Sequence, residues 1–312
     1  MNERMKILIA YDGSTCADDA LNDLPRAGLP READALIVQV EERWLSPPSG
    51  YKTVEEVVVS TNAVAAKPAR DKEEPQAKTD DESRTSLERA SQRTGVYYPE
   101  WKTETLSLKG SPAREIIHSA KEWNANLIVV GSHGCTESKR FMLGSVSHKI
   151  ANEAACSVRV VRGQAWKKGS PSRLLIGLDG TKGASAAVEE VARRMWIMGS
   201  EVRLVVARDA SENNSKWLSG YVENIRKILE HAELAVTELV EAGDPKQIIA
   251  ALAEEWGADC IFLGANDAGK FNDAGNSYEN HLLGSVSTAV VARANCTVEI
   301  VREKKKLELK NV

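Results

Sequence analysis

Short apolar runs alternate along the chain with segments in which apolar residues recur every three or four positions. The runs are rich in Val, Ile and Leu, as is typical of buried parallel strands. In the first half, these runs predict strands at 6–10, 35–40, 103–108, 127–130 and 157–161. The periodic segments between them predict helices at about 15–27, 81–94, 112–122 and 145–154.

The same order of patterns then appears a second time. Asp12-Gly13-Ser14 aligns with Asp179-Gly180-Thr181, 167 positions later; Trp123 aligns with Trp256, 133 positions later; and Cys156 aligns with Cys296, 140 positions later. In the second half, strands are therefore expected at 173–178, 202–207, 235–240, 260–263 and 297–301. The sequence therefore predicts two copies of one structural unit in tandem.

The alternation of strands and helices defines the expected fold class. We predict an α/β protein made of two doubly wound, five-stranded parallel-sheet domains in tandem, each Rossmann-like. The turn-rich stretch at 163–172 separates the units, so the predicted domains are residues 1–163 and 172–312. Because the alignment offset changes along the chain, we expect a long inserted loop at about 42–83 and a shorter insertion within 267–280.

Composition removes several classes of function. The 312 residues include 41 Lys and Arg against 45 Asp and Glu, a formal charge of -4, which argues against nucleic-acid binding. No apolar run approaches the length of a membrane span, and the N-terminus does not resemble a signal peptide, so we expect a cytoplasmic protein. The five cysteines form no CxxC pair, and no metal site is predicted. Cys156 and Cys296 are expected to be packing residues.

The residues that could bind a ligand come directly after two of the predicted strands. Asp12 comes after the first strand, and Gly131 ends the fourth and opens a glycine-rich loop that contains Gly134, Gly144 and Ser145. Glycines after a strand let backbone N–H groups approach phosphate oxygens, and a helix that begins at Ser145 would add its free amides. We expect Ser145 to cap that helix. The alternative interpretation is ordinary turn and cap chemistry, with Asp12 forming an Asx-type turn with Gly13.

With this spacing, Gly-x2-Gly-x9-Gly-Ser, the chain resembles a tandem universal stress protein, a family within the adenine nucleotide alpha hydrolase-like fold. The resemblance implies ATP binding, usually with Mg2+, in the first domain. It assigns the nucleoside contact to Asp12, the adenine contact to the backbone of Val40, and the phosphates to Gly131, Gly134, Gly144 and Ser145. It also implies that the two domains pair through their last strands, 157–161 and 297–301, while a homodimer of whole chains is left open.

The second half departs from the motif. Asp267 replaces the second glycine, and sixteen residues instead of nine precede Gly284-Ser285. A carboxylate there would repel a triphosphate. We therefore expect the second domain to be degenerate for nucleotide and mainly structural or regulatory.

Two function classes remain. One is an ATP-binding stress or signalling module, and the alternative is an interaction or scaffold protein that acts through its loops without binding nucleotide. No catalytic residue is predicted, and slow ATP hydrolysis ranks third because no base or arginine finger is evident. His133 is interpreted as a solvated loop residue, and Trp123 and Trp256 as packing residues.

Overall fold

The computed structural model describes residues 4–42, 80–133, 143–163, 169–208, 215–265 and 283–303. Its first half contains five strands: β1 (Met5–Ala10), β2 (Ala33–Glu42), β3 (Lys102–Gly110), β4 (Leu127–Gly131) and β5 (Ser157–Val161). The second half contains β6 (Arg173–Leu178), β7 (Glu201–Arg208), β8 (Ala235–Ala242), β9 (Cys260–Gly264) and β10 (Thr297–Val301). Every predicted strand is present, and the α/β fold class is confirmed.

The helices follow the predicted periodic segments. They are α1 (Thr15–Asp23), α3 (Asp80–Tyr97), α4 (Pro112–Glu122), α5 (Ser145–Glu153), α6 (Lys182–Arg193), α7 (Ser215–His231), α8 (Pro245–Trp256) and α9 (Ser285–Arg293), with a short 3-10 turn η1 (Leu24–Arg26). The first helix is shorter than the expected 15–27. Pro25 lacks a backbone N–H and crowds the preceding turn, so the α-helix stops and a 3-10 turn follows.

The predicted long loop at about 42–83 lies mostly outside the described residues. Its two ends are described: β2 continues to Glu42, and α3 already begins at Asp80. The last four residues of the predicted loop are therefore helical. The domain limits 1–163 and 172–312 remain a prediction.

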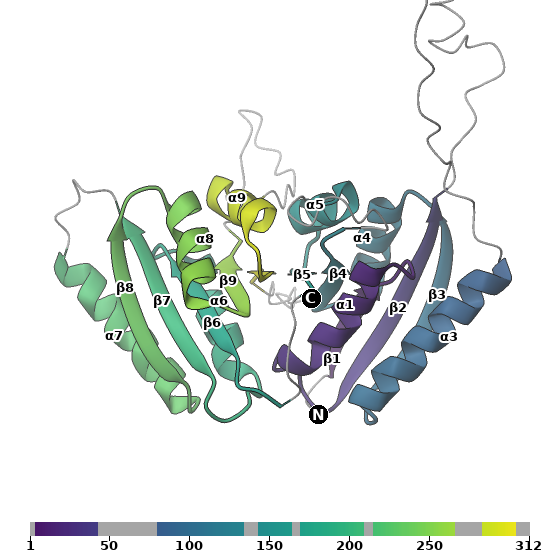
Figure 1. The fold of residues 1–312 in the computed structure, drawn as a ribbon, viewed down its shortest axis with the longest axis horizontal. Helices are drawn as coiled ribbons and strands as arrows, with labels where there is room; N and C mark the ends of the chain where they lie inside the picture. The colour runs from purple at the N-terminus through teal and green to yellow at the C-terminus, as the bar shows by residue number, and fades with distance from the viewer. Residues whose placement is uncertain are drawn as a thin grey trace, which may run out of the picture.

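All ten strands form one sheet, in the order β3-β2-β1-β4-β5-β10-β9-β6-β7-β8. The pairs within each half are parallel, whereas β5 and β10 pair antiparallel, with Val298 opposite Val160 and Ile300 opposite Val158. The two halves therefore lie side by side and join through their last strands, as the resemblance implied (Figure 1).

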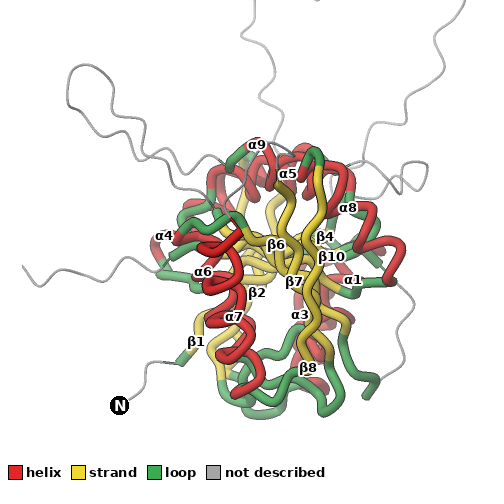
Figure 2. Tube along the Cα trace, turned by 90° about the vertical axis from the view of Figure 1, so that its left-hand side faces the viewer, coloured by secondary structure: helices red, strands yellow, loops and turns green. Residues whose placement is uncertain are grey.

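Helices cover both faces of this sheet (Figure 2). On one face, α4, α5, α8 and α9 pack on a single apolar core that runs across both halves. On the other face, α1 and α3 cover a separate core in the first half, and α6 and α7 cover one in the second. Among the described residues, no helix is both long and apolar enough to cross a membrane.

Candidate functional site

Three parallel strands of the first half end next to one another. β1 lies between β2 and β4, with Ala10 opposite Val38 and Ile9 opposite Val129. Continued along the strands, this register brings Asp12 opposite Val40 of β2. It brings Gly131 of β4 opposite the residue just before Asp12. The helices after β1 and β4 cover opposite faces of the sheet, so a switch point lies between these two strands. Such a point is where open α/β sheets bind ligands.

Asp12 holds the turn between β1 and α1. Its Oδ1 accepts a hydrogen bond from the backbone N–H of Ser14 at 2.9 Å, and Gly13 has a φ of 75°. Ser14 in turn caps α1 by accepting from the N–H of Ala17 at 3.1 Å. The Asx-type turn considered in the alternative interpretation is thus present. Because the Asp12 side chain is exposed, it lies at the surface of the candidate site as well.

Gly131 is required by packing between strand and helix. A Cβ on Gly131 would lie 2.5 Å from the carbonyl oxygen of Cys16, which belongs to the first turn of α1. Real side chains do not tolerate such a contact with backbone, so only glycine fits at the end of β4. This close approach explains Gly131 without any ligand, and it also brings the first turn of α1 against the strand end.

The N-terminus of α5 opens over the same strand end. The cap position is Gly144, which makes no side-chain cap hydrogen bond, and its N–H donates to the Ser132 carbonyl at 2.8 Å. The prediction that Ser145 caps α5 is therefore wrong: Ser145 is the first helical residue, and its side chain is exposed. Ser147 donates instead to the Gly131 carbonyl at 2.6 Å and ties the helix to β4.

Ser132 and His133 lie between these two helix ends. Ser132 is buried, and its Oγ lies 3.0 Å from His133 Nδ1. Burial, together with the positive charge of Arg162, lowers the pKa of His133 and so favours the neutral imidazole. Burial likewise raises the pKa of the Cys16 thiol, although a hydrogen bond from the backbone of His133 opposes that shift. The interpretation of His133 as a solvated residue is wrong, because the ring is half-buried and its Nε2 is fully enclosed.

The second half repeats most of this geometry. Asp179 Oδ1 accepts from the N–H of Thr181 at 3.0 Å, and Thr181 caps α6. A Cβ on Gly264 would lie 2.0 Å from the carbonyl carbon of Gly183, which is an even closer approach than in the first half. Gly284 occupies the cap position of α9. The shared turn and packing geometry shows that these features by themselves do not distinguish a binding half from a non-binding half.

Other predicted residues have clear places. Gly134 and Asp267 lie outside the described residues, as do the loops that contain them. Val40 is half-buried against the shared core, and so are Trp123 and Trp256, which confirms that both tryptophans are packing residues. Cys296 is buried, and burial raises its pKa to about 12.

The fold and the strand-end site define a protein of two Rossmann-like units joined in one sheet. The universal stress protein family model matches residues 3–162 and again 171–302, so the chain belongs to the universal stress protein family and carries its domain twice. A universal stress protein of Bacillus subtilis, YxiE, is 32% identical over 163 residues, covering 50% of this chain and 98% of its own.

Solved structures agree with the fold over the whole length. A universal stress protein from Archaeoglobus fulgidus superposes with a TM-score of 0.66 at 21% identity, covering 96% of this chain and 98% of its own. A universal stress protein family protein from Arabidopsis thaliana, described with AMP bound, covers 45% of this chain and 97% of its own, at 12% identity and a TM-score of 0.33.

Proposed function

We propose that the first half binds one adenine nucleotide, ATP with Mg2+, at the carboxyl ends of β1, β2 and β4. The protein would act as a cytoplasmic nucleotide-responsive stress module, and no catalytic step is required. The predicted contacts are Asp12 with the nucleoside, the backbone of Val40 with adenine, and four loop and helix residues with the phosphates: Gly131, Gly134, Gly144 and Ser145.

One observation carries this proposal: the N-terminus of α5 begins with a glycine cap at the switch point of the sheet. Gly144 offers no side-chain acceptor to the first amides of the helix, and Ser145 presents an exposed hydroxyl beside them. Free amides and the positive end of a helix dipole favour phosphate. The exposed Asp12 carboxylate lies level with Val40 on the neighbouring strand, which supports a site that is polar at both ends.

Mg2+ fits this arrangement only as a partner of the phosphates. The described residues contain no group of three or more His, Cys, Asp or Glu side chains that could hold a metal ion. Mg2+ usually keeps several waters and binds phosphate oxygens with one or two carboxylates, so a dedicated protein cage is not needed. When bound, the ion would neutralise charge on the phosphates.

For the second half, we propose a structural or regulatory role. Asp267 stands where the motif has a glycine, and seven additional residues separate Gly264 from Gly284. A like charge near a triphosphate costs free energy, and a longer loop carries its amides along a different path. The expected stoichiometry is one ATP per chain.

Calorimetric titration of the full chain with ATP and Mg2+ tests the proposal. Asp12→Asn is the sharpest variant because an amide oxygen can still accept from Ser14 and preserve the turn, while the charge is removed. Asp179→Asn is the matched control in the equivalent turn. We expect Asp12→Asn to weaken binding by about tenfold, or ~1.4 kcal/mol, and Asp179→Asn to leave it unchanged.

A second variant tests the loop. Gly134→Asp introduces into the first half the kind of residue that the second half carries, and it should weaken ATP binding by at least about tenfold. Absence of binding by the unmodified chain would reject the proposal and favour the scaffold alternative. Two equivalent sites, one of them lost with Asp179→Asn, would reject the unequal roles of the halves.

A further inference from the structure

The strands that join the two halves each carry a single charged residue on one face. In β5, Val158 and Val160 enter the shared core, so Arg159 points to the opposite face; in β10, Glu299 does the same. Both charged side chains are buried, Arg159 with 1% and Glu299 with 0% of its surface exposed. They stand directly opposite each other in the antiparallel register.

Arg159 and Glu299 are also equivalent positions in the repeat, 140 residues apart. The local twofold axis that relates the halves therefore passes between them. At such an axis, a strand that paired with a second copy of itself would place each residue opposite its own kind. Arg159 would face Arg159, or Glu299 would face Glu299.

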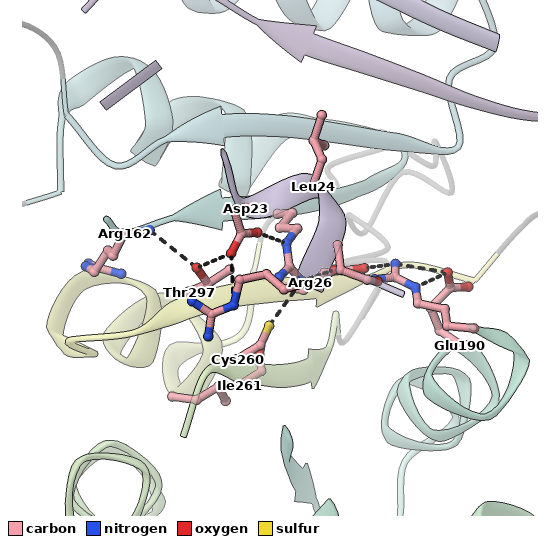
Figure 3. Close-up of polar contacts among 12 residues, drawn as sticks. Asp23, Leu24, Arg26, Arg162, Glu190, Cys260, Ile261 and Thr297 are labelled. Atoms are coloured by element: carbon pink, nitrogen blue, oxygen red, sulfur yellow. Dashed lines mark hydrogen bonds and ion pairs between the residues drawn. The ribbon is translucent and has the colours of Figure 1, made fainter. Parts of the chain in front are cut away.

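A chain of alternating charges crosses the junction at this point (Figure 3). Asp23 of the first half accepts from Arg159 Nε at 2.5 Å, and Arg159 Nη1 donates to Glu299 Oε2 at 2.9 Å. Arg194 Nη1 donates to the same Glu299 oxygen at 2.9 Å, and Arg194 Nη2 donates to Glu190 Oε1 at 3.0 Å. Each guanidinium thus lies between two carboxylates.

Arg159 is fully charged in this setting. Burial by itself lowers the pKa of its guanidinium, but the surrounding negative groups, Asp23 foremost, raise it well above its ordinary value. A buried charge is tolerated only when it is paired and hydrogen-bonded. The opposite sign at position 299 is therefore part of what allows Arg159 to be buried.

Each half pairs one of its buried carboxylates with an arginine of its own, and Arg26 of the first half also pairs with Asp259 of the second. Asp23 and Glu190 are equivalent positions, 167 residues apart, and each pairs with an arginine of its own half. Arg194 has Ala27 as its counterpart, so the second half supplies an additional arginine that also donates to the Ala27 carbonyl at 2.9 Å. The network is thus matched to one particular pairing, first half with second half.

We infer that the Arg159 and Glu299 pair selects association of the two unlike halves and disfavours association of either last strand with its own copy in another chain. The partner that this surface fits is the other half of the chain itself. A self-paired strand would bury two like charges at the axis, an arrangement that costs free energy and acts against the wrong partner. β5 and β10 therefore pair with each other within one chain, and neither strand pairs with its copy in a second chain.

The preference of each half for the unlike half can be measured after the covalent link between them is cut. A specific protease site is inserted within residues 164–168 of the full chain, which is cut after folding, and the halves are left to redistribute. Native mass spectrometry then separates unlike pairs from the two kinds of like pair by mass. For the unmodified sequence, we expect unlike pairs to exceed like pairs by at least about tenfold.

Glu299→Gln is the test variant. Arg159 keeps Asp23 and Arg194 keeps Glu190, so no guanidinium loses its last carboxylate. We expect like pairs of the second half to rise by about tenfold or more, because two neutral amide side chains at position 299 do not repel each other. Like pairs of the first half should not rise, because Arg159 would still face Arg159.

The matched control is Arg162→Gln with Arg302→Gln. These two arginines are equivalent positions, and each contacts the end of a helix in the opposite half. A like pair would make the same contact, so their loss should weaken all pairs and leave the ratio unchanged. Because the chain is cut after folding, a variant that cannot refold from denaturant is still scored. Comparable like and unlike pairs in the unmodified protein, or a ratio unchanged by Glu299→Gln, would overturn the inference.

Discussion

Arg162 and Arg302 make the same contact in opposite directions across the junction. Arg162, just after β5, donates from Nη2 to the Val291 carbonyl at 2.6 Å in the last turn of α9. Arg302, just after β10, donates from Nη2 to the Ala151 carbonyl at 2.8 Å in the last turn of α5. Each half therefore satisfies the free carbonyls at the helix end of the other, where a cation also complements the helix dipole.

Loss of either arginine should destabilise the whole chain. We expect Arg162→Gln and Arg302→Gln each to lower the free energy of unfolding by about 1 to 2 kcal/mol, because buried carbonyls lose a charged donor. The two sites share no hydrogen-bond partner, so the double variant should show the sum of the two effects. Urea unfolding of the three variants measures this. No change in either single variant would contradict a stabilising role for these contacts.

Gly131→Ala tests whether the glycine at the end of β4 is a packing requirement. A Cβ there meets the Cys16 backbone at 2.5 Å, and backbone cannot move aside without shifting α1. We expect a loss of about 1 to 3 kcal/mol in the absence of any nucleotide. Gly95→Ala is the control, because nothing lies within 4 Å of its added Cβ and alanine favours the helix. Equal thermal midpoints for the two variants would show that the contact is relieved at no cost.

The strand pattern was the most predictable part of this fold. The expected limits of 157–161, 173–178 and 297–301 match the structure in full, because these strands are buried on both faces and read as continuous apolar runs. The repeat also placed two equivalent last strands in the chain, and the resemblance implied their pairing. Sequence therefore predicted the architecture together with the joint between the halves.

The polar details of that joint were not predicted. Arg159 and Glu299 each interrupt an apolar strand at equivalent positions with opposite signs, and this signal is visible in the sequence once the repeat is aligned. Arg194 has no such signal, since its counterpart Ala27 is apolar and its partners come from distant elements. The hydrophobic periodicity of one unit cannot predict contacts that form only where the two units meet.

The candidate site was only partly predictable for a similar reason. The motif located the strand ends correctly, but it did not reveal that Gly144 takes the cap position or that His133 is half-buried. A cap is set by backbone dihedrals within one residue, which sequence patterns resolve poorly. Burial of a loop side chain depends on its neighbours, here Cys16 and Arg162 from other elements.

The inserted segment predicted at about 42–83 should be the first site of proteolysis. A segment with this content of Pro, Gly and charged residues is expected from its composition to bury little apolar surface, whereas β2 and α3 on either side pack against other elements. Brief trypsin treatment of the native chain, followed by mass spectrometry, should give first cuts between Lys52 and Lys78. First cuts within α4 or α8, with this segment intact, would contradict the prediction.

Tyr98 should make stability fall at alkaline pH. Its hydroxyl donates to the Leu24 carbonyl at 2.9 Å, and its ring stacks on Trp101 with 4.0 Å between ring centroids. Burial, the largest cause, raises the pKa of Tyr98 from its ordinary value of 10.0 to about 12. Ionisation is thus easier in the unfolded chain. The contribution of the neutral phenol is complete below pH 10 and is lost as pH rises toward 12, by about 2 kcal/mol.

Tyr98→Phe separates this effect from the titration of other groups. At pH 8, we expect the variant to be less stable by about 1 kcal/mol, because the Leu24 carbonyl loses its donor. Between pH 10 and 12, its stability should fall less steeply than that of the unmodified chain, so the two curves converge. Tyr97→Phe is the control. The hydroxyl of Tyr97 donates to Asn22 Oδ1 at 3.2 Å in an exposed contact, and removing this hydroxyl should leave the slope unchanged. Urea unfolding at intervals from pH 8 to 12 measures both slopes, and parallel curves for Tyr98→Phe and the unmodified chain would show that Tyr98 does not govern the alkaline loss.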